Sequence, residues 1–210
     1  MIQIIPGILA ATREEFQQML NKLQSLAPIL QVDISDGVFT PTKLVGLEEI
    51  AMADSPRFQV HLMVQNPEEA VLPFLKIQNV ESIIFHIEAT DKAGKIIDTI
   101  QRAGKRAGIA LNPETGIEAI APFAGQADFI QFMMVHPGGY GGEFQSQVLA
   151  KMANFHEKYP AVVIEIDGGA NPQRVPEMVK AGATMIESGG YIMNSEDPAQ
   201  AILNLQKSGE

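Results

Sequence analysis

Apolar runs rich in β-branched residues recur at fairly even intervals along this chain, and segments with helix signals separate them. A short apolar run bounded by such segments is typical of a buried strand. Strands that alternate with helices pair in parallel through right-handed crossovers. We predict strands at residues 4–9, 29–35, 58–64, 82–88, 107–112, 129–135, 161–167 and 184–188.

Residues that start or end helices mark the segments between these strands. Thr12 and Glu15 have the spacing of a capping box, in which each side chain bonds the backbone N–H of the other residue. Pro67 after Asn66 suits the first turn of a second helix, and Gly104 suits the end of a third. The segments 171–182 and 197–209 repeat this pattern, whereas 43–55 carries the weakest helix signal.

The number of strands and the short connections favour a (β/α)8 barrel over an open, doubly wound sheet. A chain of 210 residues is long enough for one domain with a sizeable core. No linker, low-complexity tract or block of like charge marks a boundary. We therefore predict an α/β protein with a single (β/α)8 TIM-barrel domain over residues 1–210.

Composition excludes several classes of protein. With a formal net charge of −10, the chain lacks the basic clusters that nucleic acid and anionic membranes require. Backbone N–H groups at helix N-termini can still bind a phosphate. The chain has no Cys, and hence no disulfide or thiolate ligand. We find neither a run of about 18 apolar residues nor a signal-peptide pattern, so we expect a cytoplasmic protein that does not span a membrane.

The predicted strand at 29–35 carries polar residues on one face. Side chains alternate along a strand, so Gln31, Asp33 and Ser35 point to the same side. A buried carboxylate is unfavourable unless it is paired, hydrogen-bonded or bound to a metal. The segment is therefore either an edge strand with a hydrated face or part of a site.

Two other strand ends carry ionisable residues that would converge with Asp33. His61 lies in the strand at 58–64, and Asp167 ends the strand at 161–167. In a (β/α)8 barrel the active site lies at the carboxyl ends of the strands. Two carboxylates and an imidazole brought together there suit acid–base chemistry or metal binding.

Other residues of the strand ends have simpler interpretations. His86 is typical of a hydrogen-bonded core histidine. Met63, Met133 and Met134 suit core packing, and the pair Asp36–Gly37 suits a turn.

Glycine pairs follow the last three predicted strands. They occur in "HPGGYGGEF" (136–144), "DGGANP" (167–172) and "SGGY" (188–191). Glycine permits positive φ angles and lets the backbone approach a ligand closely. Loops after the seventh and eighth strands form the phosphate site common in such barrels, and plain tight turns are the alternative.

Several stretches, taken in order, carry a resemblance to one family. They are "IPGILAA", "VDISDGVFTP", "VHLMV", "FHIEA", "GIALNPET", "MMVHPGGYGG", "IDGGAN" and "AGATMIESGG". With these stretches, the chain resembles the ribulose-phosphate 3-epimerase family nearly from end to end. The resemblance implies a barrel that epimerises a ketopentose phosphate at C3, with two Asp residues as acid and base. It also implies a divalent metal, held by two His and the same two Asp, that stabilises a cis-enediolate.

Carried over residue by residue, the resemblance makes Asp33 and Asp167 the acid–base pair. It implies a small phosphorylated sugar as substrate, no organic cofactor and, as in many such barrels, a homo-oligomer. The implied metal site comprises Gln31, Asp33, His61 and Asp167. The implied substrate-binding residues, the last four of them at the phosphate, are Gly7, Ser35, His61, Met63, His86, Met133, Gly138, Gly139, Gly141, Gly142, Gly168, Gly169, Gly189 and Gly190.

Several residues depart from the family's pattern. Gln31 stands where the family has a His ligand, Ser35 where it has Met, and Gly7 where it has a Ser near the sugar. His136 and Gly190 replace an Asn and a Ser of the glycine loops. A Gln amide oxygen is a weak, neutral ligand that suits a hard cation better than Zn²⁺. We therefore expect a reduced affinity for the metal, whether this is Zn, Mn, Mg or Fe.

These residues are compatible with three functions. The first is an isomerase that interconverts ribulose 5-phosphate and xylulose 5-phosphate, or that acts on another ketose phosphate. The second is a homologue that binds a phosphate ester without catalysis. Gln31, Gly7 and Ser35 favour it, whereas the two Asp residues and His61 oppose it. The third, a decarboxylase or aldolase of a related barrel, would need a Lys in "DISDG", which has none.

Overall fold

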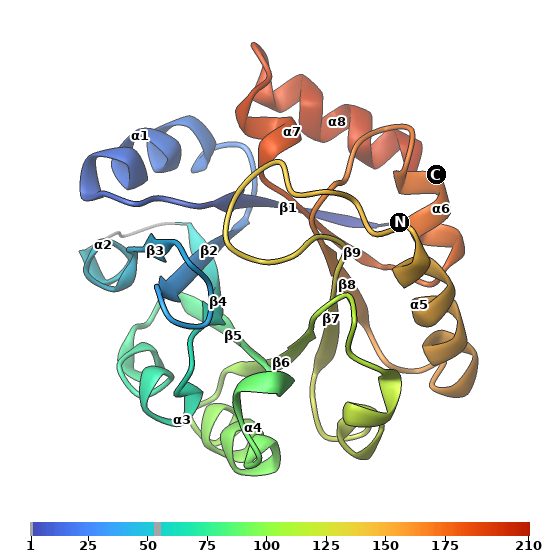
Figure 1. The fold of residues 1–210 in the computed structure, drawn as a ribbon. Coiled ribbons are helices and arrows are strands. Elements are labelled where there is room, and N and C mark those ends of the chain that lie inside the picture. Colours follow the sequence, from blue (N-terminus) through green and yellow to red (C-terminus); the bar gives the residue numbers. More distant parts are fainter. Residues whose placement is uncertain (1, 53–55) are drawn as a thin grey trace.

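The computed structural model describes residues 2–52 and 56–210, which form a closed barrel of parallel strands surrounded by helices (Figure 1). Strand β1 pairs with both β2 and β9, and this double pairing closes the sheet. The predicted (β/α)8 barrel is thus confirmed, because an open sheet would leave two strand edges unpaired. The barrel strands are β1 (Gln3–Ile8), β2 (Ile29–Asp36), β4 (Arg57–Met63), β5 (Val80–His86), β6 (Arg106–Leu111), β7 (Phe129–Met133), β8 (Ile164–Asp167) and β9 (Met185–Ser188).

A short strand and several short helices differ from the prediction. β3 (Lys43–Leu44) pairs antiparallel with the end of β2, and two residues are too few for a periodic pattern to predict. In the predicted helical segment 43–55, only Leu47–Met52 is helical, and residues 53–55 lie outside the described part. The link between β6 and β7 contains two 3₁₀ turns, Ile117–Ala119 and Ala121–Phe123.

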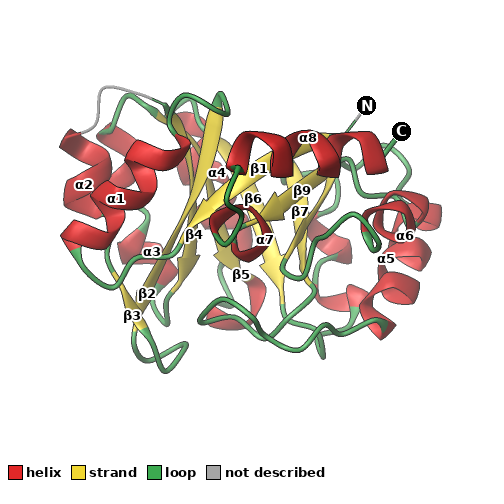
Figure 2. Ribbon diagram, turned by 90° about the horizontal axis from the view of Figure 1, so that it is seen from above, coloured by secondary structure: helices red, strands yellow, loops and turns green. Residues whose placement is uncertain are grey.

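Helices cover the outer surface of the barrel (Figure 2). The capping box of Thr12 and Glu15 is confirmed at the start of the first helix. Gly104 follows α4 with a φ of +76°, as a helix-ending glycine should. The helices are α1 (Arg13–Leu23), α2 (Leu47–Met52), α3 (Pro67–Ala70), α4 (Ala93–Arg102), α5 (Gln147–Lys158), α6 (Val175–Lys180), α7 (Gly190–Met193) and α8 (Pro198–Ser208). None of the helices within residues 2–52 and 56–210 combines the length and the apolar composition that a membrane span requires.

The two faces of each strand have different neighbours. Outward-facing residues such as Val32, Val60 and Ile166 are fully buried in the apolar core between strands and helices. In the interior, the pairing of β2 with β4 sets Gln31 beside Gln59 and Asp33 beside His61. The alternation predicted for residues 29–35 therefore places polar side chains inside the barrel.

Candidate active site

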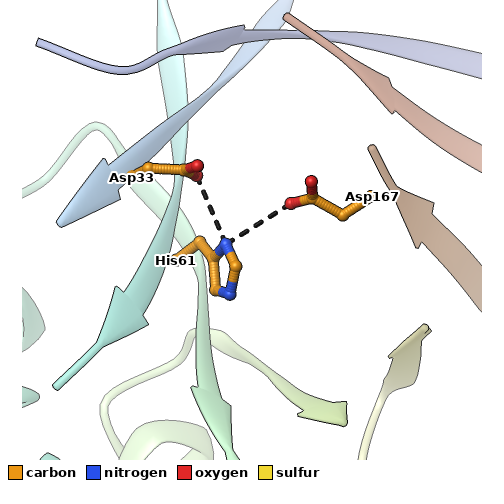
Figure 3. A group of neighbouring side chains, drawn as sticks. All are labelled: Asp33, His61 and Asp167. Atoms are coloured by element: carbon orange, nitrogen blue, oxygen red, sulfur yellow. Dashed lines mark hydrogen bonds and ion pairs between the residues drawn. The ribbon is translucent and has the colours of Figure 1, made fainter. Parts of the chain in front are cut away.

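Three ionisable side chains meet inside the barrel, as the sequence predicts. Asp33 comes from β2, His61 from β4 and Asp167 from the end of β8 (Figure 3). The Nδ1 atom of His61 lies 3.3 Å from Oδ1 of Asp33 and 3.4 Å from Oδ2 of Asp167. All three residues are buried, so the imidazole contacts both carboxyl groups where little of any side chain is exposed to solvent.

This arrangement shifts all three pKa values. Burial lowers the pKa of His61, but the charges and hydrogen bonds of the two Asp residues outweigh it and raise the pKa to about 10. Burial raises the pKa of Asp33. Burial acts in the same direction on Asp167, but the hydrogen bond and charge of His61, together with hydrogen bonds from Gln31 and Glu187, outweigh it and lower the pKa of this residue. Asp33 therefore holds a proton more readily than Asp167, which is the difference that an acid and a base need.

Gln31 bridges the two carboxyl groups through its amide nitrogen. Its Nε2 donates to Oδ1 of Asp33 at 2.8 Å and to Oδ2 of Asp167 at 2.7 Å. Its Oε1 accepts from the Nε2 atoms of Gln59 and Gln131, both at 3.1 Å. The amide oxygen, the only atom of this group that could ligate a cation, thus faces away from the carboxylates. Gln31 could act as a fourth ligand only with its amide turned over, so its place in the metal set stays a prediction.

Asp33, His61 and Asp167 could by themselves hold a metal ion. Each offers one ligand atom, and these atoms lie within 4.8 Å of one another. Two carboxylate oxygens and an imidazole nitrogen are a donor set that divalent transition metals accept. His61 would have to be neutral as a ligand, and its partners would exchange hydrogen bonds from Gln31 for bonds to the cation.

His86 lies beside His61, with the centres of the two rings 5.0 Å apart. Its Nε2 is 2.9 Å from Nε2 of His61, and its Nδ1 is 3.3 Å from Oε2 of Glu88. Glu88 in turn accepts a hydrogen bond of 2.7 Å from the backbone N–H of Asn112. The side chain is fully buried, which agrees with the interpretation of His86 as a hydrogen-bonded core residue.

A cavity of about 520 Å³ opens above the carboxylates. Its wall includes both Asp residues and nine other residues that the sequence pointed to. They are Met63, Met133, Gly139, Gly141, Gly142, Gly168, Gly169, Gly189 and Gly190. The predicted residues that do not line the cavity are Gly7, Gln31, Ser35, His61, His86 and Gly138.

For two of these residues, a local contact explains why they do not line the cavity. The Oγ of Ser35 is 2.6 Å from Oγ1 of Thr40, so this hydroxyl is already hydrogen-bonded to the loop that follows β2. Gly138 packs against the same threonine, whose Cβ would lie 3.2 Å from an added Cβ at position 138. Both residues therefore shape the loop, and their contact with a substrate stays a prediction.

The backbone of the loop after β8 leaves no place for residues other than glycine at two positions. Gly168 and Gly169 have φ values of +97° and +70°, which other residues rarely adopt. A Cβ at Gly168 would also lie 2.5 Å from the side chain of Val135. Beside this loop, Nη1 of Arg174 donates to the backbone oxygen of Gly169 at 2.9 Å, and its guanidinium lies 4.2 Å from the centre of the Phe144 ring. Arg174 brings a positive charge to the cavity wall that sequence reasoning missed.

Sequence reasoning also missed Tyr140 and Glu187, both of which line the cavity. The hydroxyl of Tyr140 donates to the backbone oxygen of Gly7 at 2.9 Å and accepts from Leu9 N–H at 3.3 Å. It thereby ties the loop after β7 to β1. For Glu187 a signal existed: strand alternation places it on the same face as Met185, which is the interior face.

The fold and this cavity define a (β/α)8 barrel with paired carboxyl groups and glycine loops at the carboxyl ends of its strands. The chain matches the model of the Ribulose-phosphate 3 epimerase family over residues 3–193. It therefore belongs to the ribulose-phosphate 3-epimerase family, a family of isomerases, and the predicted family and enzyme class are confirmed.

Individual relatives agree over almost the whole chain. The rice (Oryza sativa subsp. japonica) "Ribulose-phosphate 3-epimerase, cytoplasmic isoform" is 30% identical over 216 residues, which cover 99% of this chain and 94% of the relative. The Mycobacterium bovis ribulose-phosphate 3-epimerase is 31% identical over 214 residues, with 97% and 91% covered. A solved structure, that of KGPDC from Streptococcus mutans, shares the fold with a TM-score of 0.73 at 9% identity, covering 99% of this chain and 96% of that one.

Proposed function

We propose that the protein interconverts ribulose 5-phosphate and xylulose 5-phosphate by moving a proton at C3. The observation that carries this proposal is the pair of carboxyl groups of Asp33 and Asp167, which both line the cavity and lie on either side of His61. A 3-epimerisation needs one group on each face of the carbon, one to remove a proton and one to return it.

In the proposed reaction, ionised Asp167 removes the proton from C3, and the electron pair of the broken C–H bond moves onto the C2 carbonyl to give an enediolate. Protonated Asp33 then delivers its proton to the opposite face of C3, which restores the ketone with inverted configuration. The opposite shifts of the two pKa values fit these roles, and in the reverse reaction the roles exchange.

The polar groups beneath the carboxyl pair would stabilise the developing negative charge. The imidazolium of His61 and the amide N–H groups of Gln31 already lie against both carboxyl groups. A divalent cation held by Asp33, His61 and Asp167 would supply positive charge to the enediolate oxygens when bound. The chain's own part is to orient the two acids and to exclude water.

We assign the phosphate of the substrate to the glycine loops. Residues 168–169 and 189–190 line the cavity and would offer backbone N–H groups to the phosphate, and Arg174 contributes a cation beside them. Met63 and Met133 supply the apolar part of the wall. A cytoplasmic location and a homo-oligomeric state remain predictions.

A different ketose phosphate is the second candidate substrate, and Glu187 favours it. This residue adds a carboxyl group to the cavity wall next to the acid–base pair. A homologue without catalysis is the outcome that the following experiment would reveal.

NMR of ribulose 5-phosphate in D₂O tests the proposal. The protein is incubated first with a chelator and then with Mn²⁺, Zn²⁺ or Mg²⁺. We expect xylulose 5-phosphate with deuterium at C3, and the comparison of conditions reports whether metal is needed. If deuterium is never incorporated while the protein still binds phosphate esters, the proposed reaction is wrong for this substrate.

A further inference from the structure

Glu187 is a buried carboxyl group without a partner of opposite charge. It lies on β9 with 3% of its surface exposed, and its Oε1 has no hydrogen-bond partner. No ion pair among the described residues includes it. It shares a hydrogen bond with the carboxyl group of Asp167, and neither Asp167 nor Asp33, which both act on it, can offer it a positive charge. Burial of such a group is unfavourable for folding, so its place in the barrel calls for another explanation.

The backbone across from Glu187 is shaped to receive this side chain. A Cβ at Gly7 would lie 2.0 Å from Oε1 of Glu187, which is closer than atoms can approach. Any side chain at position 7 would therefore force the carboxyl group out of its present place. Gly7 does not itself line the cavity, because Glu187 from the neighbouring strand occupies the space beside it.

The same end of β9 holds a second buried polar atom without a hydrogen-bond partner. The Oγ of Ser188 is buried and unbonded, and both Ser188 and Glu187 line the cavity with Asp33 and Asp167. Unpaired polar atoms around a cavity are the expected state of a site whose hydrogen bonds are completed by a ligand.

We propose that Glu187 is a specificity-determining residue that hydrogen-bonds a hydroxyl group on the carbon chain of the substrate, and that Gly7 is the partner that gives it room. A hydroxyl group both donates and accepts, so it pairs with a carboxyl group in either protonation state. The inference rests on the proposed sugar-phosphate substrate and deepens it: the ligand must offer a hydroxyl to the wall formed by β9 and β1.

Calorimetry with ribitol 5-phosphate tests this inference without turnover, because that polyol lacks the ketone and cannot be epimerised. We expect Glu187→Val to raise its Kd about tenfold, the usual loss for one hydrogen bond. Glu187→Gln, which keeps the shape and one acceptor oxygen, should stay within about threefold of the wild type. The Kd for inorganic phosphate, which has no carbon chain, should not change in either variant.

Two further measurements separate binding from a merely structural role. In assays with ribulose 5-phosphate, Glu187→Val should raise KM by a larger factor than it lowers kcat, because the lost contact is to the substrate while Asp33 and Asp167 still move the proton. Ile186→Val, on the outward face of the same strand, should lower the Tm without changing either Kd. If Glu187→Val folds and binds ribitol 5-phosphate like the wild type, the inference is wrong.

Gly7→Ala provides the same test from the other strand if Glu187→Val does not fold. Its Cβ would displace the carboxyl group, so it should also weaken binding of ribitol 5-phosphate, and the double variant Gly7→Ala/Glu187→Val should recover part of the Tm lost in Gly7→Ala. An unchanged Kd in Gly7→Ala would overturn the inference. If the wild type binds ribitol 5-phosphate through Glu187 yet never epimerises ribulose 5-phosphate, the proposed reaction fails and the inference stands.

Discussion

The two ends of the barrel interior are built from opposite kinds of residue. Toward the amino ends of the strands, apolar side chains such as Ile5, Ile29 and Phe129 fill the interior and are buried almost completely. Toward the carboxyl ends, the equally buried interior holds glutamines, histidines and carboxyl groups. Burial of apolar groups stabilises the fold, whereas burial of charged groups opposes it. The amino end of the interior therefore supports the fold, and the carboxyl end carries the chemistry.

The largest predicted effect is a loss of turnover, caused by substitutions at the carboxyl end of the interior. Asp33→Asn or Asp167→Asn should lower turnover of ribulose 5-phosphate by about 10³-fold or more, because an amide neither removes nor delivers the C3 proton. NMR in D₂O measures the rate, and circular dichroism checks that the barrel remains folded. Asp128→Asn serves as the control, since that carboxylate accepts a bond from Ala107 N–H at the other end of the barrel. Full activity in both active-site variants would exclude the proposed mechanism.

A substitution at the amino end of the interior should lower stability and leave turnover nearly unchanged. Phe129 is fully buried against Ile84 and Ala110. Phe129→Ala should lower the free energy of unfolding by about 3–5 kcal/mol, through lost burial and the cavity left behind. Urea titration measures this loss, and turnover per folded molecule should stay close to that of the wild type. A large fall in kcat with intact folding would show that the two ends are not independent.

The buried ionisable groups should make stability depend on pH. The pKa of His61 rises from an ordinary 6.5 to about 10 on folding, so its contribution is complete below pH 6.5 and is lost as the pH rises through 10. Burial raises the pKa of Glu165 from 4.5 to about 8, so its contribution is likewise lost between those values. The free energy of unfolding should fall by about 3 kcal/mol or more from pH 5 to pH 10.

Urea titrations at several pH values measure this fall in the free energy of unfolding. Two variants separate the contributions of Glu165 and His61 to it. Glu165→Gln should flatten the part between pH 5 and 8, and His61→Gln should flatten the part above pH 7. A wild-type stability that stays constant up to pH 10 would mean that neither group is held as the structure places it.

The sequence predicted the barrel well because alternation is a local property. Eight apolar runs predicted eight strands, and their alternation put Gln31, Asp33 and His61 on the inner face. The short α2 and the 3₁₀ turns after β6 were harder, because short segments are decided by packing that a local pattern does not contain.

The finer features of the site depend on contacts between distant parts of the chain. The direction of the Gln31 amide is set by Gln59 and Gln131, which lie 28 and 100 residues away. The fit between Glu187 and Gly7 depends on the pairing of the last barrel strand with the first. No local pattern reports such contacts, so the sequence predicted which residues enter the site and missed how their hydrogen bonds are shared.

The smallest predicted effect concerns the metal. In Gln31→His an imidazole nitrogen would replace the amide that now binds Asp33 and Asp167, so divalent-metal affinity should rise by about tenfold. Calorimetry with Zn²⁺ and Mn²⁺ measures the change. Gln31→Leu is the control, because it removes the amide hydrogen bonds without adding a ligand. A rise in Gln31→His alone would mean that the wild-type site lacks a fourth donor. An equal rise in both variants would mean instead that the amide of Gln31 competes with the cation for the same carboxylate oxygens.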